Sequence, residues 1–245
     1  ISSLVGKDKS AAETERELIK SRMVLKPVVN KLHLNLKVSN PELGALDRIA
    51  QSAIPTQTSN EKGVFLETEQ GLVHISSFEV PHAYENRPFT ISKTDRGFDL
   101  QVEIGDVVEQ YQGNIGSESI ISTPEGEIKI FVQSLPTLGH NIRLTKQSMP
   151  SAINSLNSAL SVAEKGKQTG ILQLTLEGED QKQVSRVLSN IVQSYVNQNL
   201  ARGSEQTTTT IKFMQSQIPE LKQKLEQSEK EFNKFILGDQ RGWEQ

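Results

Sequence analysis

The hydrophobic period changes twice along this 245-residue chain, and these changes constrain its fold more than any other feature. Apolar residues follow helical spacing up to about residue 38, strand alternation up to about residue 146, and helical spacing again afterwards. Residues three or four apart share a helix face, whereas alternate residues share a strand face. The order of these periods predicts an α+β chain in which a β-rich middle separates two helical parts.

The opening segment, about 10–38, is expected to form a helix that runs into a short strand. Ser10 is a suitable N-cap residue. The apolar face of this helix contains Leu18, Leu25, Val29 and Leu32. Pro27 lies inside the pattern and predicts a kink or break nearby. Apolar and polar residues alternate from residue 32 to residue 36, which predicts that the strand begins there.

Most prolines of the chain fall between residues 40 and 146, and glycines separate the short alternating runs of this segment. Short alternating runs between Gly/Pro turns are typical of an antiparallel meander, sandwich or small barrel. The alternation predicts strands at residues 73–80, 89–93, 98–103, 127–134 and 141–146.

The last segment, from about Ser148, returns to helical spacing. Ser148 before Pro150 predicts a helix start, and the apolar face of that helix is expected at Ile153, Leu156, Leu160 and Ala163. Alternation in Leu172–Leu176 predicts one strand. Asp180 and Gln183 then begin another helix. Its expected apolar face contains Val184, Leu188, Ile191 and Tyr195.

After the polar stretch 203–210, apolar residues recur at heptad spacing. This heptad seam consists of Ile211, Met214, Ile218, Leu221, Leu225 and Phe232, and Phe235 continues the spacing. Such a seam predicts packing on a neighbouring helix or oligomerisation. The alternative is an ordinary amphipathic helix packed on its own domain. Pro219 is expected to bend the helix.

Acid–base and metal chemistry find little support in the sequence. There is no cysteine, and the four histidines, His33, His74, His82 and His140, have no ligand spacing. Glu177, Glu179 and Asp180 stand at a strand end and helix start, where carboxylates favour capping. We therefore expect no catalytic residue, no cofactor site and no metal site.

The net charge of −3 gives no general electrostatic reason to bind nucleic acid. No apolar run approaches the roughly 20 residues that a membrane helix needs. The sequence starts at Ile1 without Met, and we expect it to be a piece of a longer protein.

Several segments together resemble a known family. They are residues 21–25, the run GILQLTLEGED at 170–180, residues 187–191 and 195–200, Phe213–Met214, and residues 218–221 with the charged heptads that follow. The pattern is similar to the chain-length determinant (Wzz-type) family of bacterial polysaccharide co-polymerases. Within that family it is most similar to the Wzc-type tyrosine autokinases of capsule and exopolysaccharide export. The resemblance covers about half of the chain, roughly 10–38 and 140–234.

The resemblance implies a domain layout. Residues 10–38 and 140–200 would form a discontinuous α/β domain near the membrane, with residues 40–139 as a β-rich antiparallel insertion. Residues 201–237 would form a long helical extension, and residues 238–245 a disordered tail or truncation point.

The resemblance also implies a function. Such a domain lies in the periplasm between two inner-membrane helices, which this sequence lacks. It forms homo-oligomers, controls polysaccharide chain length, and works with the polymerase and an outer-membrane export channel. This piece would not be an enzyme, whereas the full-length parent would carry a cytoplasmic tyrosine autokinase domain.

Two alternatives stay open. A periplasmic adaptor of a secretion or efflux pump would place heptad helices of similar length on both sides of the β-rich middle. A polysaccharide-binding module would use exposed aromatic residues of the middle segment as sugar platforms, although most are expected in the core. The candidates are Phe65, Phe78, Tyr84, Phe89, Phe98, Tyr111 and Phe131.

Overall fold

The computed structural model describes residues 11–41, 57–166, 169–178 and 180–239. The fold is α+β, with antiparallel sheets and several helices, as the changes of hydrophobic period predicted. The chain divides into two units, and the division falls between Tyr195 and Val196.

The opening segment forms two short helices, α1 (Ala11–Ile19) and α2 (Arg22–Lys31). The expected break is present, but it falls at Ser21, the extended N-cap residue of α2, and Pro27 lies inside α2. Proline there removes one helical hydrogen bond without ending the helix. The predicted face is confirmed, because Leu25, Val29 and Leu32 are fully buried. Ser10 lies outside the described residues.

The strand predicted from residue 32 begins later, at β1 (Leu36–Ser39). Leu32 is still the C-cap of α2, and His33 has a positive φ of 51°. A left-handed residue of this kind commonly ends a helix. The alternation from residue 32 therefore spans a helix end and a turn before the strand starts.

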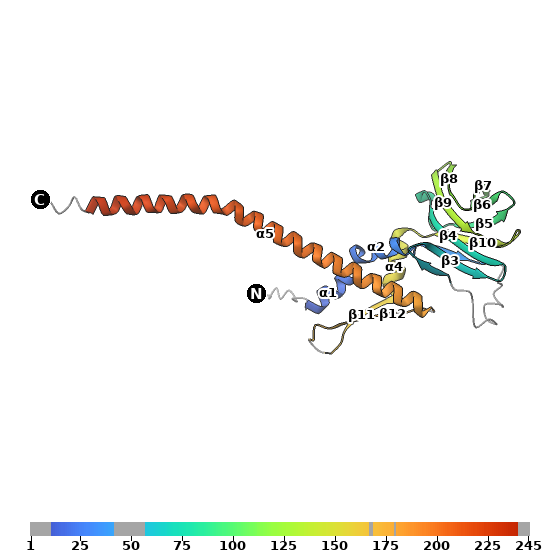
Figure 1. The fold of residues 1–245 in the computed structure, drawn as a ribbon, viewed down its shortest axis with the longest axis horizontal. Helices are drawn as coiled ribbons and strands as arrows, with labels where there is room; N and C mark the ends of the chain where they lie inside the picture. Colours follow the sequence, from blue (N-terminus) through green and yellow to red (C-terminus); the bar gives the residue numbers. More distant parts are fainter. Residues whose placement is uncertain (1–10, 42–56, 167–168, 179, 240–245) are drawn as a thin grey trace, which may run out of the picture. The chain divides into compact units, whose positions relative to one another are not determined.

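Two five-stranded antiparallel sheets form the β-rich part (Figure 1). The first has the order β1, β10 (Asn141–Lys146), β5 (Pro88–Thr94), β6 (Gly97–Ile104) and β7 (Val107–Gly113). The second has the order β2 (Thr58–Asn60), β3 (Gly63–Thr68), β4 (Gly71–Glu79), β9 (Gly126–Ser134) and β8 (Glu118–Thr123). A short 3-10 helix, η1 (His82–Tyr84), connects β4 to β5.

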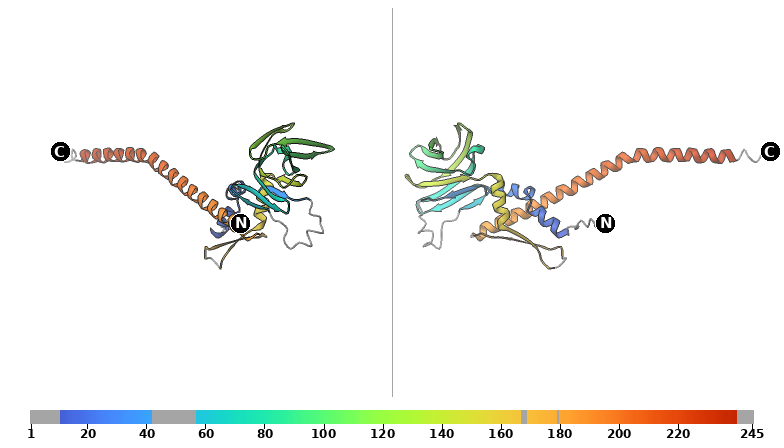
Figure 2. Two further views of the ribbon diagram at one scale, coloured as in Figure 1. Left: turned by 45° about the vertical axis from the view of Figure 1, so that its right-hand side comes forward. Right: turned by 180° about the vertical axis from the view of Figure 1, so that it is seen from behind.

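The sheets share one core, which we call the sheet core, and Figure 2 shows them from two further sides. Phe78 of β4 meets Phe89 of β5 edge to face, with ring centroids 5.2 Å apart. Aromatic pairs favour this geometry because the ring edge and ring face carry opposite partial charges. The largest fully buried side chains of the sheet core are Tyr84, Phe78, Phe89, Phe98, Leu36, Ile75, Ile91, Leu100, Ile128 and Ile130.

The five predicted strands are confirmed within one to two residues, as β4, β5, β6, β9 and β10. Strands β2, β3, β7 and β8 were not predicted. β7 has polar residues at most positions after Val108, and β2 has three residues, so neither gives a clear alternating signal. Gly63 starts β3 at φ +123°, where a Cβ would lie 2.2 Å from the Ile75 carbonyl oxygen. Only glycine fits this close approach of two strands.

After β10 the chain enters α4 (Met149–Ala159), capped by the Ser148 hydroxyl, which accepts from the Ser151 amide. The prediction that this helix continues to Ala163 is wrong. Leu160–Glu164 is strand β11, paired antiparallel with β12 (Leu172–Leu176), the strand that the sequence predicted. Leu160 and Val162 are buried at alternate positions, as expected for a strand. The helix therefore ends at Ala159.

The helix predicted from Asp180 is α5 (Gln181–Asp239), which is 59 residues long. Asp180 caps it, because its Oδ1 accepts from the Lys182 amide at 2.8 Å and its carbonyl accepts from the Val184 amide. The helix continues through the polar stretch 203–210. The Gly203 and Ser204 carbonyls accept hydrogen bonds from Thr207 and Thr208, a local pairing that a helix tolerates.

Segments from both ends of the first unit share a second core, the helical core. Its buried members are Ile19, Val24, Leu25, Val28, Val29, Leu32, Ala152, Ile153, Leu156, Leu160, Val162, Val187 and Ile191. Partly buried Leu172, Leu174 and Leu176 of β12 pack against it. The opening helices and the β12 strand therefore lie in one packed body, as the sequence argument required.

Candidate functional site

Most of the histidine and carboxylate side chains singled out in the sequence have local structural contacts. His74 stacks on Phe65, and exposed His82 contacts the Glu85 carboxylate at 2.7 Å. Asp180 is engaged as a helix cap. Among the described residues, no group of three or more His, Cys, Asp or Glu side chains is arranged to hold a metal ion.

The carboxylate of Glu109 binds two phenols inside the β-rich part. The hydroxyls of Tyr84 and Tyr111 both donate to Glu109 Oε2, at 2.8 and 2.6 Å. Burial raises the pKa of Tyr111 well above its usual range, and the hydrogen bond to Glu109 raises it further. Tyr111 is therefore a neutral donor at every physiological pH, and this cluster is structural.

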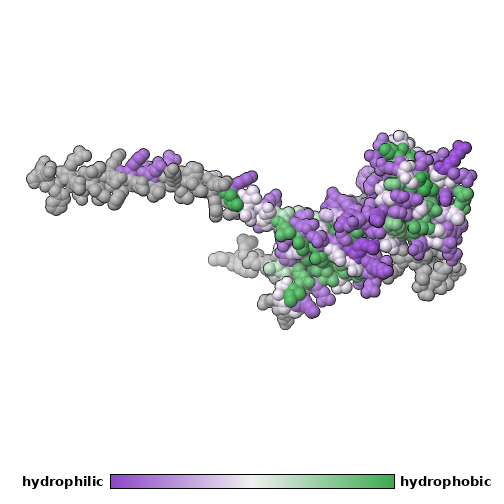
Figure 3. Space-filling model, in the orientation of Figure 1, coloured by the Kyte–Doolittle hydropathy of each residue, from purple (hydrophilic) through white to green (hydrophobic). Residues whose placement is uncertain are grey.

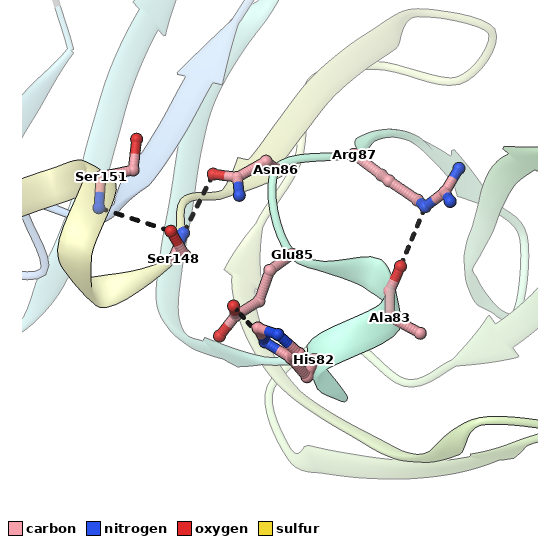
Figure 4. A network of polar contacts seen from close by, with 7 residues as sticks. All are labelled: His82, Ala83, Glu85, Asn86, Arg87, Ser148 and Ser151. Atoms are coloured by element: carbon pink, nitrogen blue, oxygen red, sulfur yellow. Dashed lines mark hydrogen bonds and ion pairs between the residues drawn. The ribbon is translucent and has the colours of Figure 1, made fainter.

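A polar network attaches α4 to the sheets (Figure 4). Asn86 has a positive φ of 62°. Its side-chain Oδ1 accepts a hydrogen bond from the Ser148 backbone amide, and its backbone amide donates to the Lys146 carbonyl. The Ser148 hydroxyl in turn caps α4. In the same loop, Arg87 Nε donates to the Ala83 carbonyl. The helix start is thus held to the loop that precedes β5.

A second attachment joins α5 to the edge strand β2. The Ser59 amide donates to Gln183 Oε1 at 3.2 Å, and the Ser59 carbonyl accepts from Arg186 Nη1 at 3.0 Å. The side chains of Gln183 and Arg186 thus form the hydrogen bonds that another strand would otherwise make with this edge of β2. Gln183 Oε1 also accepts from Arg186, which fixes both side chains in place.

Beside this attachment lies a large cleft, which we call the β3–α5 cleft. Its volume is about 1040 Å³. Its lining residues are Thr58, Asn60, Phe65, Glu67, Thr68, Glu69, Leu72, Asp180, Gln181, Lys182 and Arg186. They come from strands β2, β3 and β4 and from the start of α5. Phe65 and Asp180 were singled out in the sequence, whereas Glu67, Glu69, Lys182 and Arg186 were not.

Three of the four residues predicted for the apolar face at the start of α5 belong to the helical core or pack against it, whereas Val184 is partly buried outside that core. Ile191 is fully buried in the helical core, and Leu188 and Tyr195 pack against it. The sequence missed Val187, which is also buried. The Tyr195 hydroxyl donates to Glu15 at 2.6 Å and the Ser194 hydroxyl to the Val24 carbonyl at 2.7 Å. These contacts fasten α5 to α1 and α2.

The heptad seam is only partly described. All six residues of the seam lie within the α5 helix. Ile211 is half exposed, and the side chains of Met214, Ile218, Leu221, Leu225 and Phe232 lie outside the described residues. Packing through this seam therefore stays a prediction.

Exposed apolar residues accompany these contacts. Val192, Val196 and Leu200 are 40–69% exposed and recur every four residues along α5, a spacing that puts them on one helix face. In Figure 3, hydrophobic residues also gather on the surface around α1, β11 and β12. None of the described helices has the combined length and apolar character needed to cross a membrane.

Comparison with known proteins identifies the class to which these features belong. The chain is 34% identical over 236 residues to the tyrosine-protein kinase ptk of Acinetobacter johnsonii, an alignment that covers 96% of the chain and 32% of that protein. It is 28% identical to the tyrosine-protein kinase wzc of Salmonella typhimurium, over 96% of the chain and 30% of that protein. A third relative, the tyrosine-protein kinase etk of Escherichia coli, is 34% identical over 40% of the chain and 13% of that protein.

The chain therefore aligns with one region of bacterial tyrosine-protein kinases. The chain is homologous to part of the Wzc-type tyrosine-protein kinases, and the resemblance predicted from its sequence is confirmed. It spans about a third of the length of these relatives. No family model matches the chain.

Proposed function

We propose that this chain is the periplasmic scaffold of an inner-membrane polysaccharide co-polymerase that oligomerises and controls the length and export of a capsular or exopolysaccharide. The observation that carries the proposal is the helical core. It joins the two ends of the first unit, residues 19–32 and 152–191, into one body. Homology to Wzc-type kinases supplies the class.

The proposal assigns a domain layout. Residues 10–38 and 140–200 form the membrane-proximal part, and residues 40–139 form an insertion. Residues 201–237 form the helical extension. Strand β1 pairs with β10, so the insertion begins and ends on neighbouring strands, and its two ends can meet the same body.

Oligomerisation in this proposal uses the heptad seam of α5. The seam spans Ile211 to Phe232 within a helix of 59 residues. Apolar a and d positions at this spacing pack against another helix in preference to water. Ile211, half exposed in the isolated chain, would become buried in the assembly.

The catalytic activity is assigned to another part of the parent protein. The relatives are named tyrosine-protein kinases, and this chain aligns with about a third of the ptk protein of Acinetobacter johnsonii and of the wzc protein of Salmonella typhimurium. The parent is proposed to be a tyrosine autokinase whose kinase domain lies in the cytoplasm. Its proposed partners are the polysaccharide polymerase and an outer-membrane export channel.

The competing adaptor function predicts helices of similar length before and after the sheets. In the described residues, α1 and α2 have 9 and 10 residues, whereas α5 has 59. That asymmetry disfavours a helical hairpin and favours the co-polymerase.

The mass of the full-length protein in native lipid tests the proposal. We expect a closed homo-oligomer, and expect Leu221→Asp with Leu225→Asp to reduce it to smaller species and to alter polysaccharide length in cells. Lys212→Asp, which changes charge outside the seam, is the matched control. A strict monomer in lipid would contradict the proposal.

A further inference from the structure

The β3–α5 cleft has walls that are already fixed. Gln183 and Arg186 bind the two backbone groups of Ser59 and one another, so the start of α5 is held against β2. The volume of about 1040 Å³ lies just above the range of roughly 300–1,000 Å³ that is usual for pre-formed ligand sites. In Figure 1 this end of α5 lies near β3, as the shared lining requires.

One wall of the cleft carries an aromatic platform. Phe65 lies on β3 between buried Val64 and Leu66, and its own side chain is partly exposed in the cleft. His74 of β4 stacks against its ring with centroids 4.0 Å apart and planes 21° from parallel. His74 is itself held by the Lys62 carbonyl, 3.0 Å from Nε2. The ring is therefore backed and oriented before any ligand arrives.

Polar groups without partners surround this platform. Within the described part of the chain, the side chains of Glu67, Glu69 and Lys182 make no hydrogen bond or ion pair. Two carboxylates offer acceptors and one ammonium offers donors, all free to bind a ligand. Arg186 retains further N–H donors beyond the two contacts of Nη1.

This combination selects a chemical class. An aromatic face attracts the weakly positive C–H groups of a sugar ring, because the ring quadrupole is negative on its face. Hydroxyls need both donors and acceptors at the edge of that face. The lining carries three carboxylates and two basic groups, and this mixed charge disfavours a strongly anionic ligand such as a nucleic acid.

We propose that the β3–α5 cleft binds a segment of a neutral or weakly charged polysaccharide, with a sugar ring on Phe65 and its hydroxyls on Glu67, Glu69 and Lys182. The identity of the polymer as a capsular or exopolysaccharide rests on the proposed function. Binding at this position would bring the polymer to the start of α5.

Binding can be tested by NMR titration of the isotope-labelled 245-residue chain. The ligands are oligosaccharides prepared from the capsular polysaccharide of the strain that encodes the protein. We expect saturable shifts in the amide signals of Phe65, Leu72 and Lys182. Phe65→Ala should weaken binding at least tenfold, because it removes the stacking face. The matched control is Phe131→Ala, which removes a partly exposed phenylalanine of the same sheet outside the cleft and should bind normally.

Glu69→Gln with Lys182→Gln provides a second test, since both side chains are exposed and their loss should leave the fold intact. This double variant should weaken binding about threefold to tenfold. Absence of saturable shifts, or unchanged binding by both cleft variants, would overturn the cleft assignment. Assembly of the full-length protein in lipid is independent of sugar binding, so a cleft that fails while the oligomer forms leaves the proposed function standing.

Discussion

The two cores of the first unit are built from the sequence in different ways. The sheet core is made largely by neighbouring hairpins, such as β3 with β4, β5 with β6, and β8 with β9. The helical core joins residues 19–32 to residues 152–191, with the whole β-rich part between them in sequence. The sheet core therefore forms mainly by pairing of strands that are close in sequence. The helical core forms only when two segments separated by more than 100 residues come together.

The difference leads to an expectation about stability. Each hairpin of the sheet core can form before distant segments meet, whereas the helical core needs the sheets in place to bring its two ends together. We expect the helical core to open without loss of the sheet core, but not the reverse.

The largest effect should follow from Phe89→Ala in the sheet core. Phe89 is fully buried and contacts the rings of Phe78 and Tyr84, so truncation leaves a large cavity between the sheets. We expect a loss of about 3–5 kcal/mol in the free energy of unfolding. Urea unfolding followed by circular dichroism measures it, and both cores should unfold together. Protection of α2 and α4 amides in a variant with melted sheets would contradict the expected order.

A smaller and more local effect should follow from Leu25→Ala in the helical core. Leu25 is fully buried, and the change should cost about 2–4 kcal/mol. Hydrogen exchange should accelerate in α2 and α4 while β5, β6 and β9 stay protected. An equal loss of protection in both cores would show that they form one cooperative unit. The matched control is Met23→Ala, because Met23 is a 57% exposed neighbour on the same helix.

The two cores also differed in how well the sequence predicted them. Alternation found β5, β6 and β9 because their inward positions are uniformly apolar, as in Phe98, Leu100 and Val102. It missed β7, an edge strand that has no fully buried residue and carries exposed Gln110 and Gln112. Periodicity reports burial, so strands with little buried surface give little signal.

In the helical core the errors came from boundaries. Leu160 fits the α4 pattern, yet it is buried from strand β11, because pairing with β12 overrides helical spacing. The β3–α5 cleft could not be predicted at all. Phe65 and Lys182 are brought together by the contacts of Gln183 and Arg186 with Ser59, a pairing more than 120 residues apart in sequence.

A smaller loss of stability should follow when one hydrogen bond between α5 and α2 is removed. The Ser194 hydroxyl donates to the Val24 carbonyl at 2.7 Å in a partly buried position. Ser194→Ala should lower the free energy of unfolding by about 1 kcal/mol, the usual net value of one hydrogen bond. The same change at Ser204, an exposed position of α5, should have no measurable effect. Alanine favours a helix more than serine does, so helix propensity cannot cause a loss at either position. An equal loss at Ser204 would therefore contradict the contribution assigned to the contact with α2.

The smallest expected effect lies where the two cores meet, at His33 between α2 and β1. Burial holds the pKa of His33 below its ordinary value, and the nearby charge of Lys146 lowers it further. Glu79 and a backbone hydrogen bond with Glu61 act in the opposite direction without reversing the shift. The folded chain therefore favours neutral His33.

The sign of the pH dependence follows from this shift. As pH falls below the ordinary histidine pKa of about 6.5, the unfolded chain binds a proton that the folded chain resists, and stability is lost until the lower folded pKa is passed. His33→Asn keeps a residue that tolerates the positive φ but cannot titrate. Urea unfolding at pH 7.5, 6 and 5 should show a shallower decline for the variant than for the parent chain. Parallel declines would mean that His33 contributes no proton-linked stability.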